Sequence, residues 1–151
     1  MKLSTTTFQL GQPLPQPCSC DGGDRSPTLA WDEVPVSTPS FALVCDDPDA
    51  PRGTWVHWVL FNLPADACEL AAGVPRLPEL PSGARQGIND GGDIGYSGPC
   101  PPRGGPHRYF FRLYALDTVL NLGPGVNRSD LDEAMTGHVL AEATIMGTYQ
   151  R

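Results

Sequence analysis

The sequence predicts a mainly β fold in which two antiparallel sheets pack against each other, with one or two short helices. Three observations support this prediction. Apolar or alternating segments of strand length are separated by turns. Glycine and proline each occur 17 times among 151 residues, about twice their usual share, which disfavours long helices. One segment near the end of the chain has the spacing and capping residues of a helix.

The first half of the chain predicts four strands that differ in their hydrophobic pattern. Residues 3–10 predict an edge strand, and residues 28–31 predict a second strand after a Pro/Gly/Asp loop. Residues 41–45 form a continuous apolar run, which is typical of a strand buried on both faces. Residues 54–63 predict a central strand, and strict alternation divides it into a face with Trp55, His57, Val59 and Phe61 and a face with Val56, Trp58, Leu60 and Asn62.

The second half of the chain opens with a long loop over residues 64–106 and then becomes regular. Residues 107–117 predict a strand with His107, Tyr109, Phe111, Leu113 and Ala115 on one face. Ser129 and Asp132 match a capping box, so we expect a helix that begins at Ser129 and ends near Leu140. Residues 141–149 alternate and predict a final strand.

Size, composition and charge limit the class of protein. A chain of 151 residues with 40% hydrophobic and 18% charged residues is expected to form one domain over residues 1–151. The formal net charge is −7 and Lys2 is the only lysine, so we expect no nucleic-acid partner. No run reaches the roughly 18 apolar residues of a membrane span. A hydrophobic signal core is also absent from the first residues, so a cytoplasmic location without membrane insertion is the default expectation.

The five cysteines predict neither a metal site nor a disulfide framework. Their number is odd, they form no C-x-x-C pair, and Cys18 and Cys20 are too close for a zinc knuckle. In a cytoplasmic protein we expect most of them to be reduced. We also expect no cofactor.

Three segments concentrate polar residues at strand ends. Residues 47–51 (DPDAP) place two carboxylates on a corner stiffened by two prolines, although such a segment is also typical of a plain turn. His57 lies among aromatic residues, where a core histidine is the simpler interpretation. Residues 95–109 form a Pro/Gly loop that leads into a His-Arg strand start, and an ordinary surface loop is the alternative there.

Taken together, the DPDAP segment, the His57 strand and the run Y-x-G-P-C-P-P…P-H-R-Y resemble the phosphatidylethanolamine-binding protein family, also called the Raf kinase inhibitor protein family. The resemblance is strongest to its short bacterial and archaeal members and covers nearly the whole chain. Further matches are Cys20-Asp21-Gly22-Gly23, Gly83–Gly87 and Gly137–Ala141. The chain departs from the family at Cys18 and lacks the longer C-terminal helix of the mammalian members.

The resemblance implies two packed antiparallel sheets and a small pocket for anions such as phosphate, phosphorylethanolamine, sulfate or acetate. It also implies a cis Ala50–Pro51 bond. The residues that it assigns to the pocket are Asp47, Asp49, His57, Pro101, Pro102, His107 and Tyr109, with Tyr96 and Cys100 at the entrance. No catalytic or metal-binding residue is assigned.

The residue chemistry is compatible with such a pocket. Two imidazoles can each donate a hydrogen bond to an anion, and binding should strengthen toward mild acid. The Asp47 carboxylate can hold either His57 or His107 in the donating tautomer, or accept from an ethanolamine ammonium group. Prolines add shape to the walls without competing donors.

The predicted function is therefore non-enzymatic binding of a small anion or phospholipid headgroup, with an affinity of roughly mM to µM and a role in modulating kinase or protease signalling. One alternative is a kinase or protease inhibitor that acts through its surface with a vestigial pocket. A second, less favoured alternative is a metal-dependent hydrolase, because two Asp and two His residues can ligate a metal; no known hydrolase motif accompanies them. A homodimer is about as favoured as a monomer.

Overall fold

The computed structural model describes all 151 residues, which form two antiparallel sheets and one α-helix, as the sequence predicted. The larger sheet has the strand order β6-β4-β3-β7-β8 and the smaller has the order β1-β2-β5. The larger sheet consists of β3 (Ser40–Asp47), β4 (Trp55–Pro64), β6 (Arg85–Gln86), β7 (His107–Leu116) and β8 (Val139–Tyr149). The smaller consists of β1 (Lys2–Ser4), β2 (Leu29–Asp32) and β5 (Glu69–Leu70).

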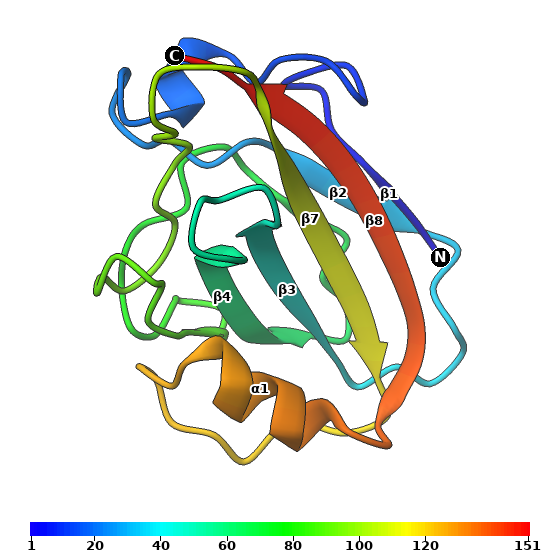
Figure 1. Ribbon diagram of the computed structural model, residues 1–151. Coiled ribbons are helices and arrows are strands. Elements are labelled where there is room, and N and C mark those ends of the chain that lie inside the picture. Colours follow the sequence, from blue (N-terminus) through cyan, green and yellow to red (C-terminus); the bar gives the residue numbers. More distant parts are fainter.

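The two faces of the larger sheet are both covered. One face packs against the smaller sheet, and the other packs against α1 (Arg128–Met135) (Figure 1). The main core lies between the sheets and includes Trp31, Phe41, Leu43 and Phe111. A second cluster, which includes Val44, Phe61 and Leu131, lies under the helix. Burial on both faces explains why β3 is apolar along most of its length.

Two irregularities break the expected alternation of β4. In the pairing with β3, Cys45 lies opposite Trp58 and Asp46 lies opposite Val56, so His57 is the extra residue of a β-bulge. A second register shift follows near Asn62, whose φ is +56°. The predicted faces are confirmed after the first bulge, because Val59 and Phe61 lie in the cluster under α1 and Trp58 and Leu60 lie in the main core. They were wrong before it, because Val56 joins the cluster under α1 instead of the main core.

The face assignment for β7 is confirmed, as is the predicted final strand, β8. Tyr109, Phe111, Leu113 and Ala115 all belong to the main core, and Ile145 of β8 packs beside them. The two strands pair in register from His107 opposite Tyr149 to Ala115 opposite Ala141.

The first strand is shorter than predicted, because β1 ends at Ser4. Beyond it, the hydroxyl of Thr28 accepts a hydrogen bond from the backbone N–H of Thr6, and the hydroxyl of Thr7 accepts one from the N–H of Thr28. These side-chain partners replace the ladder of a strand.

The predicted helix ends were also wrong. Asn127 caps α1, accepting from the N–H of Asp130, while the Asp130 carboxylate accepts from the N–H of Asn127. The helix ends at Met135, because Gly137 adopts a φ of +81° and the chain turns into β8. No helix has the length and apolar character needed to cross a membrane.

Candidate functional site

A cavity of about 220 Å³ lies where the loop that follows β3, the start of β4, the start of β7 and the proline-rich loop before β7 meet. These segments are distant in sequence, so only the sheet topology brings them together. The lining residues are Asp47, Ala50, Pro51, Trp55, His57, Ser97, Cys100, Pro101, Pro102, His107 and Tyr109.

Seven of the nine predicted site residues line this cavity, and two do not. Asp49 forms a bidentate salt bridge with Arg108, in which Nε and Nη2 of the guanidinium donate to the two carboxylate oxygens at 2.9 and 2.8 Å. Tyr96 is buried below the site, where its hydroxyl donates to the carbonyl of Cys18 at 2.7 Å. Both residues stabilise the loops around the cavity but do not reach into it.

Four lining residues were not predicted from the sequence: Ala50, Pro51, Trp55 and Ser97. The position of Trp55, four residues after Pro51 and on the same predicted face of the strand as His57, was a usable signal. Ser97 gave no signal, because its backbone carbonyl makes the contact with His57.

The alternation of β3 separates two adjacent carboxylates. Asp47 points toward the cavity, whereas Asp46 points to the opposite face of the sheet. There the Asp46 carboxylate binds the guanidinium groups of Arg112 and Arg128 at 2.9 and 3.0 Å. The second contact ties α1 to the strand that carries Asp47, so this network positions the cavity from behind.

The bulge in β4 places His57 beside Tyr109 on the cavity side of the sheet. The two rings meet edge to face, with centroids 5.3 Å apart. His57 is only 5% exposed, and this burial lowers the pKa of the imidazole. Burial and the nearby Asp47 carboxylate raise the pKa of the Tyr109 phenol, so this hydroxyl stays protonated.

Hydrogen-bond partners assign the tautomers of both imidazoles. Nδ1 of His57 lies 2.6 Å from the carbonyl oxygen of Ser97, and Nδ1 of His107 lies 2.7 Å from Oδ2 of Asp47. Both partners are acceptors, so each Nδ1 carries the hydrogen. Of the two histidines that the sequence offered to Asp47, the carboxylate contacts His107.

This assignment determines when each ring can donate to an anion. A neutral imidazole with hydrogen on Nδ1 presents Nε2 as an acceptor, and Nε2 donates only when the ring is protonated. Protonated His107 forms an ion pair with Asp47, whereas His57 contacts only a carbonyl through Nδ1. Donation to an anion is therefore expected first from His107.

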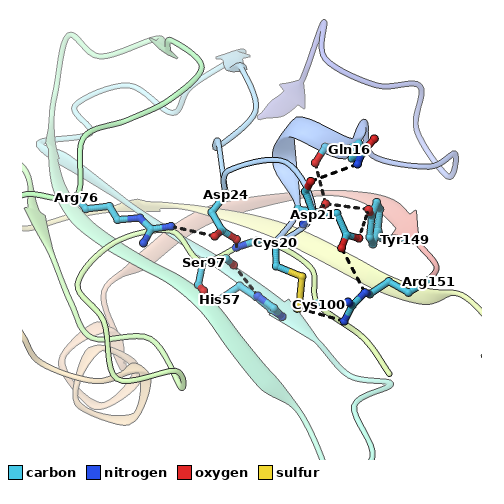
Figure 2. The surroundings of a disulfide bond; sticks show 12 residues. Gln16, Cys20, Asp21, Asp24, His57, Arg76, Ser97, Cys100, Tyr149 and Arg151 are labelled. Carbon is cyan, nitrogen blue, oxygen red and sulfur yellow. Dashed lines mark hydrogen bonds and ion pairs between the residues drawn. A yellow bond between two sulfur atoms is a disulfide. The ribbon is translucent and has the colours of Figure 1, made fainter. Parts of the chain in front are cut away.

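A disulfide joins Cys20 to Cys100, although none was predicted (Figure 2). Cys18, Cys45 and Cys68 are free, in agreement with the expectation that most of the five cysteines are reduced. The disulfide could not be predicted because the two bonded residues are 80 positions apart and have no recognisable spacing. The bond fixes the wall formed by Cys100, Pro101 and Pro102 to the loop after the short 3₁₀ helix η1 (Gln16–Cys18).

Several contacts beside the disulfide hold the same two loops together. The N–H of Cys20 donates to the carbonyl of Pro99, and the N–H of Gly98 donates to the Asp24 carboxylate. Arg151 contacts both loops, because its guanidinium lies 3.5 Å from Sγ of Cys100 and 3.5 Å from the Asp21 carboxylate (Figure 2). Gly98 is required sterically, since a Cβ there would lie 2.1 Å from the carbonyl oxygen of Cys18.

The geometry also bears on the predicted cis bond and on the alternative of a metal-dependent hydrolase. The Ala50–Pro51 bond is trans, like every peptide bond in the chain, so the predicted cis bond is wrong. No group of three or more His, Cys, Asp or Glu side chains converges in an arrangement that could hold a metal ion.

The fold and the cavity together define a two-sheet β protein with a small cavity lined by histidine, aspartate and proline residues at one end of its larger sheet. A family model described as phosphatidylethanolamine-binding protein matches residues 4–150. The chain belongs to this family.

Relatives and solved structures agree with this assignment. A protein of Methanothermobacter thermautotrophicus named UPF0098 protein is 54% identical over 151 residues, covering 100% of this chain and 99% of the relative. A UPF0098 protein of Aquifex aeolicus is 48% identical, covering 100% and 89% of the two chains.

Two crystal structures extend the comparison to three dimensions. A Chlamydia trachomatis protein described as a phosphatidylethanolamine-binding protein homologue superposes with a TM-score of 0.90 at 41% identity, covering 99% and 97% of the two chains. Escherichia coli YbcL, described as a new member of the mammalian family, superposes with a TM-score of 0.92 at 34% identity, covering 99% and 98%.

Proposed function

We propose that this protein binds a small oxyanion, of the kind carried by phosphate and by phospholipid headgroups, in the cavity between His57 and His107. The observation that carries the proposal is the convergence of two imidazoles and one carboxylate in a cavity whose other walls are mostly proline and aromatic side chains. Such walls supply shape but few competing hydrogen-bond donors.

His107 is the proposed anion contact. Its side chain is 13% exposed, and Asp47, at 4%, holds Nδ1 from behind. When the ring is protonated, the imidazolium and Asp47 form an ion pair, and Nε2–H is free to donate to an oxyanion. The global charge of −7 opposes anion binding, so the local donor must supply the attraction.

We also propose that the ligand is bound without reaction. The cavity thiol that a covalent mechanism would use, Cys100, is bonded to Cys20. The Tyr109 phenol is held in its protonated form by burial and by Asp47. Incubation with a phosphomonoester and assay of released phosphate tests this part of the proposal, and turnover above the His107→Ala variant would contradict it.

A titration of inorganic phosphate, followed by NMR of the histidine ring protons, tests the binding function. The expected result is saturable shifts at His57 and His107 with a dissociation constant of roughly mM to µM. His107→Ala should weaken binding at least about tenfold, which corresponds to the loss of one charge-assisted hydrogen bond.

The chain provides its own matched control. His138 also pairs through Nδ1 with an aspartate, Asp117, at 2.7 Å, but this pair lies on the exposed surface. His138→Ala should leave phosphate binding unchanged. Equal losses in the two variants, or no shift at either cavity histidine, would refute the proposed site.

The cellular setting and wider role belong to the same proposal. A cytoplasmic location remains a prediction, and cell fractionation with an antibody against the chain tests it. Modulation of a kinase or protease remains a prediction from the family resemblance, and the proposed function is limited to binding of the small anion.

A further inference from the structure

We propose that the cavity selects oxyanions that carry a proton donor of their own, so that the ligand donates one hydrogen bond to His57 while accepting another from His107. This inference depends on the proposed function, because it names the ligand class of the same site. It follows from the unequal environments of the two imidazoles.

His57 offers an acceptor to the cavity. The Ser97 carbonyl can only accept, so Nδ1 of His57 carries the hydrogen and neutral His57 presents a bare Nε2. This Nε2 has no hydrogen-bond partner in the protein. It is also not fully buried, because Trp31 Nε1 is the one fully buried side-chain polar atom that lacks a partner. A ligand in the cavity therefore faces an acceptor that no protein group satisfies.

The charged groups around His57 differ from those around His107, so the two rings are expected to have different roles. Asp47, Asp46 and Asp90 act on His57 through space, but desolvation outweighs them and favours the neutral ring. His107 directly contacts Asp47, and the neighbouring Asp49 is already paired with Arg108. The remaining titratable group at the site, the Tyr109 phenol, stays protonated. The ring that can donate to a ligand while paired with a carboxylate is therefore His107.

The cavity thus presents one hydrogen-bond donor, His107, and one acceptor, His57, and a ligand should match both. A phosphomonoester monoanion matches both, because one oxygen accepts from His107 and its P–OH donates to His57. An ethanolamine phosphate also matches, since its ammonium group can donate instead. Sulfate and simple phosphodiesters have no donor and leave Nε2 of His57 unsatisfied, which should weaken binding by roughly five- to a hundredfold.

Two isomeric ligands isolate this effect. Ethyl phosphate and dimethyl phosphate have the same composition, and at about pH 6 both are available as monoanions, but only ethyl phosphate has a P–OH. Dissociation constants from NMR titration, corrected for the monoanion fraction, should favour ethyl phosphate by at least about fivefold. His57→Phe should abolish this preference, and His138→Ala should preserve it.

A second pair separates the two sources of this chemistry. Glycerophosphoethanolamine and glycerophosphocholine differ in whether the nitrogen can donate a hydrogen bond. Preference for glycerophosphoethanolamine supports the inference with a lipid headgroup as the source. Preference for ethyl phosphate alone supports it with a free phosphomonoester.

The outcomes that overturn the inference differ from failure of the proposed function. Equal affinity within both pairs, or a preference that survives His57→Phe, overturns the inference while anion binding stands. Absence of binding by every ligand refutes the proposed function itself. The ¹⁵N shift of His57 Nε2 in wild-type protein gives a test independent of any variant: a bare acceptor nitrogen is expected in the ethyl phosphate complex, and a protonated one overturns the inference.

Discussion

Nδ1 of His107 lies 2.7 Å from Oδ2 of Asp47, in a contact that joins the start of β7 to the end of β3 beside the cavity. An equally short contact joins His138 to Asp117, but both of those side chains are more than 40% exposed. The two pairs thus share their local geometry and differ in burial. This difference makes the exposed pair a control for the buried one.

Asp47→Asn should weaken phosphate binding by roughly tenfold or more, because the variant loses a charge-assisted hydrogen bond that orients His107 and stabilises its imidazolium form. The measurement is the dissociation constant of inorganic phosphate from NMR titration. Asp117→Asn removes the corresponding partner of His138 and should leave that constant within about twofold of wild type. Similar effects of both changes would contradict a specific role for Asp47.

The stability of the protein should fall in mild acid because of His57. Burial lowers the pKa of this ring below its ordinary value of 6.5, so the unfolded chain binds the proton more tightly than the folded one. The free energy of unfolding is then lost as the pH falls from about 6.5 toward the folded pKa, with a slope of up to about 1.4 kcal/mol per pH unit.

Urea denaturation between about pH 7.5 and pH 5 measures this slope in the absence of ligand. His57→Phe should flatten it, and His138→Ala should not. A wild-type slope unchanged by His57→Phe would show that other groups are responsible. Asp49 cannot contribute in this range, since its folded pKa is about 2.

Asp49→Asn should affect stability more than binding. The Arg108 guanidinium lowers the pKa of the Asp49 carboxyl to about 2, so the stabilisation is present above about pH 4 and is lost as the pH falls through about 2. The carboxylate is 30% exposed, and removal of the pair should cost about 1 kcal/mol or less at neutral pH. Thermal or urea denaturation measures the cost, and the phosphate dissociation constant should change less than about twofold. A loss of affinity as large as that of His107→Ala would place Asp49 in the site after all.

Reduction of the Cys20–Cys100 disulfide should destabilise the fold and weaken anion binding. The bond closes a loop of 80 residues, and its loss should cost roughly 2–4 kcal/mol. Main-chain hydrogen bonds lie on either side of the cavity wall, at Pro99 and Gly104, but none is made by Cys100, Pro101, Pro102 or Arg103. Without the bond, this wall loses its direct attachment.

Urea denaturation and phosphate titration of wild type, with and without dithiothreitol, measure both effects. Cys20→Ser should reproduce the reduced protein, and dithiothreitol should not change it further. Cys68→Ser alters an exposed free cysteine and should behave as wild type. Five titratable thiols in protein purified without reductant would show that the bond does not form.

Local sequence patterns predicted the fold class, and the family resemblance predicted most of the candidate site. Alternation in β7 and β8 and the apolar run in β3 are local consequences of which face each strand buries, so they could be predicted without a structure. The DPDAP corner, the strand with His57 and the segment before β7 together carried the family resemblance, and that resemblance identified seven of the eleven cavity-lining positions.

How these residues are used depends on contacts between distant segments. The bulge at His57 depends on the pairing of β4 with β3, and strict alternation could not predict it. The Cys20–Cys100 disulfide, the contact of Asp47 with His107, the contact of Asp49 with Arg108 and the contact of His57 with the Ser97 carbonyl each join residues at least 40 positions apart. Strand faces follow from each segment's own sequence, but these contacts exist only after loop closure has brought distant backbones into register.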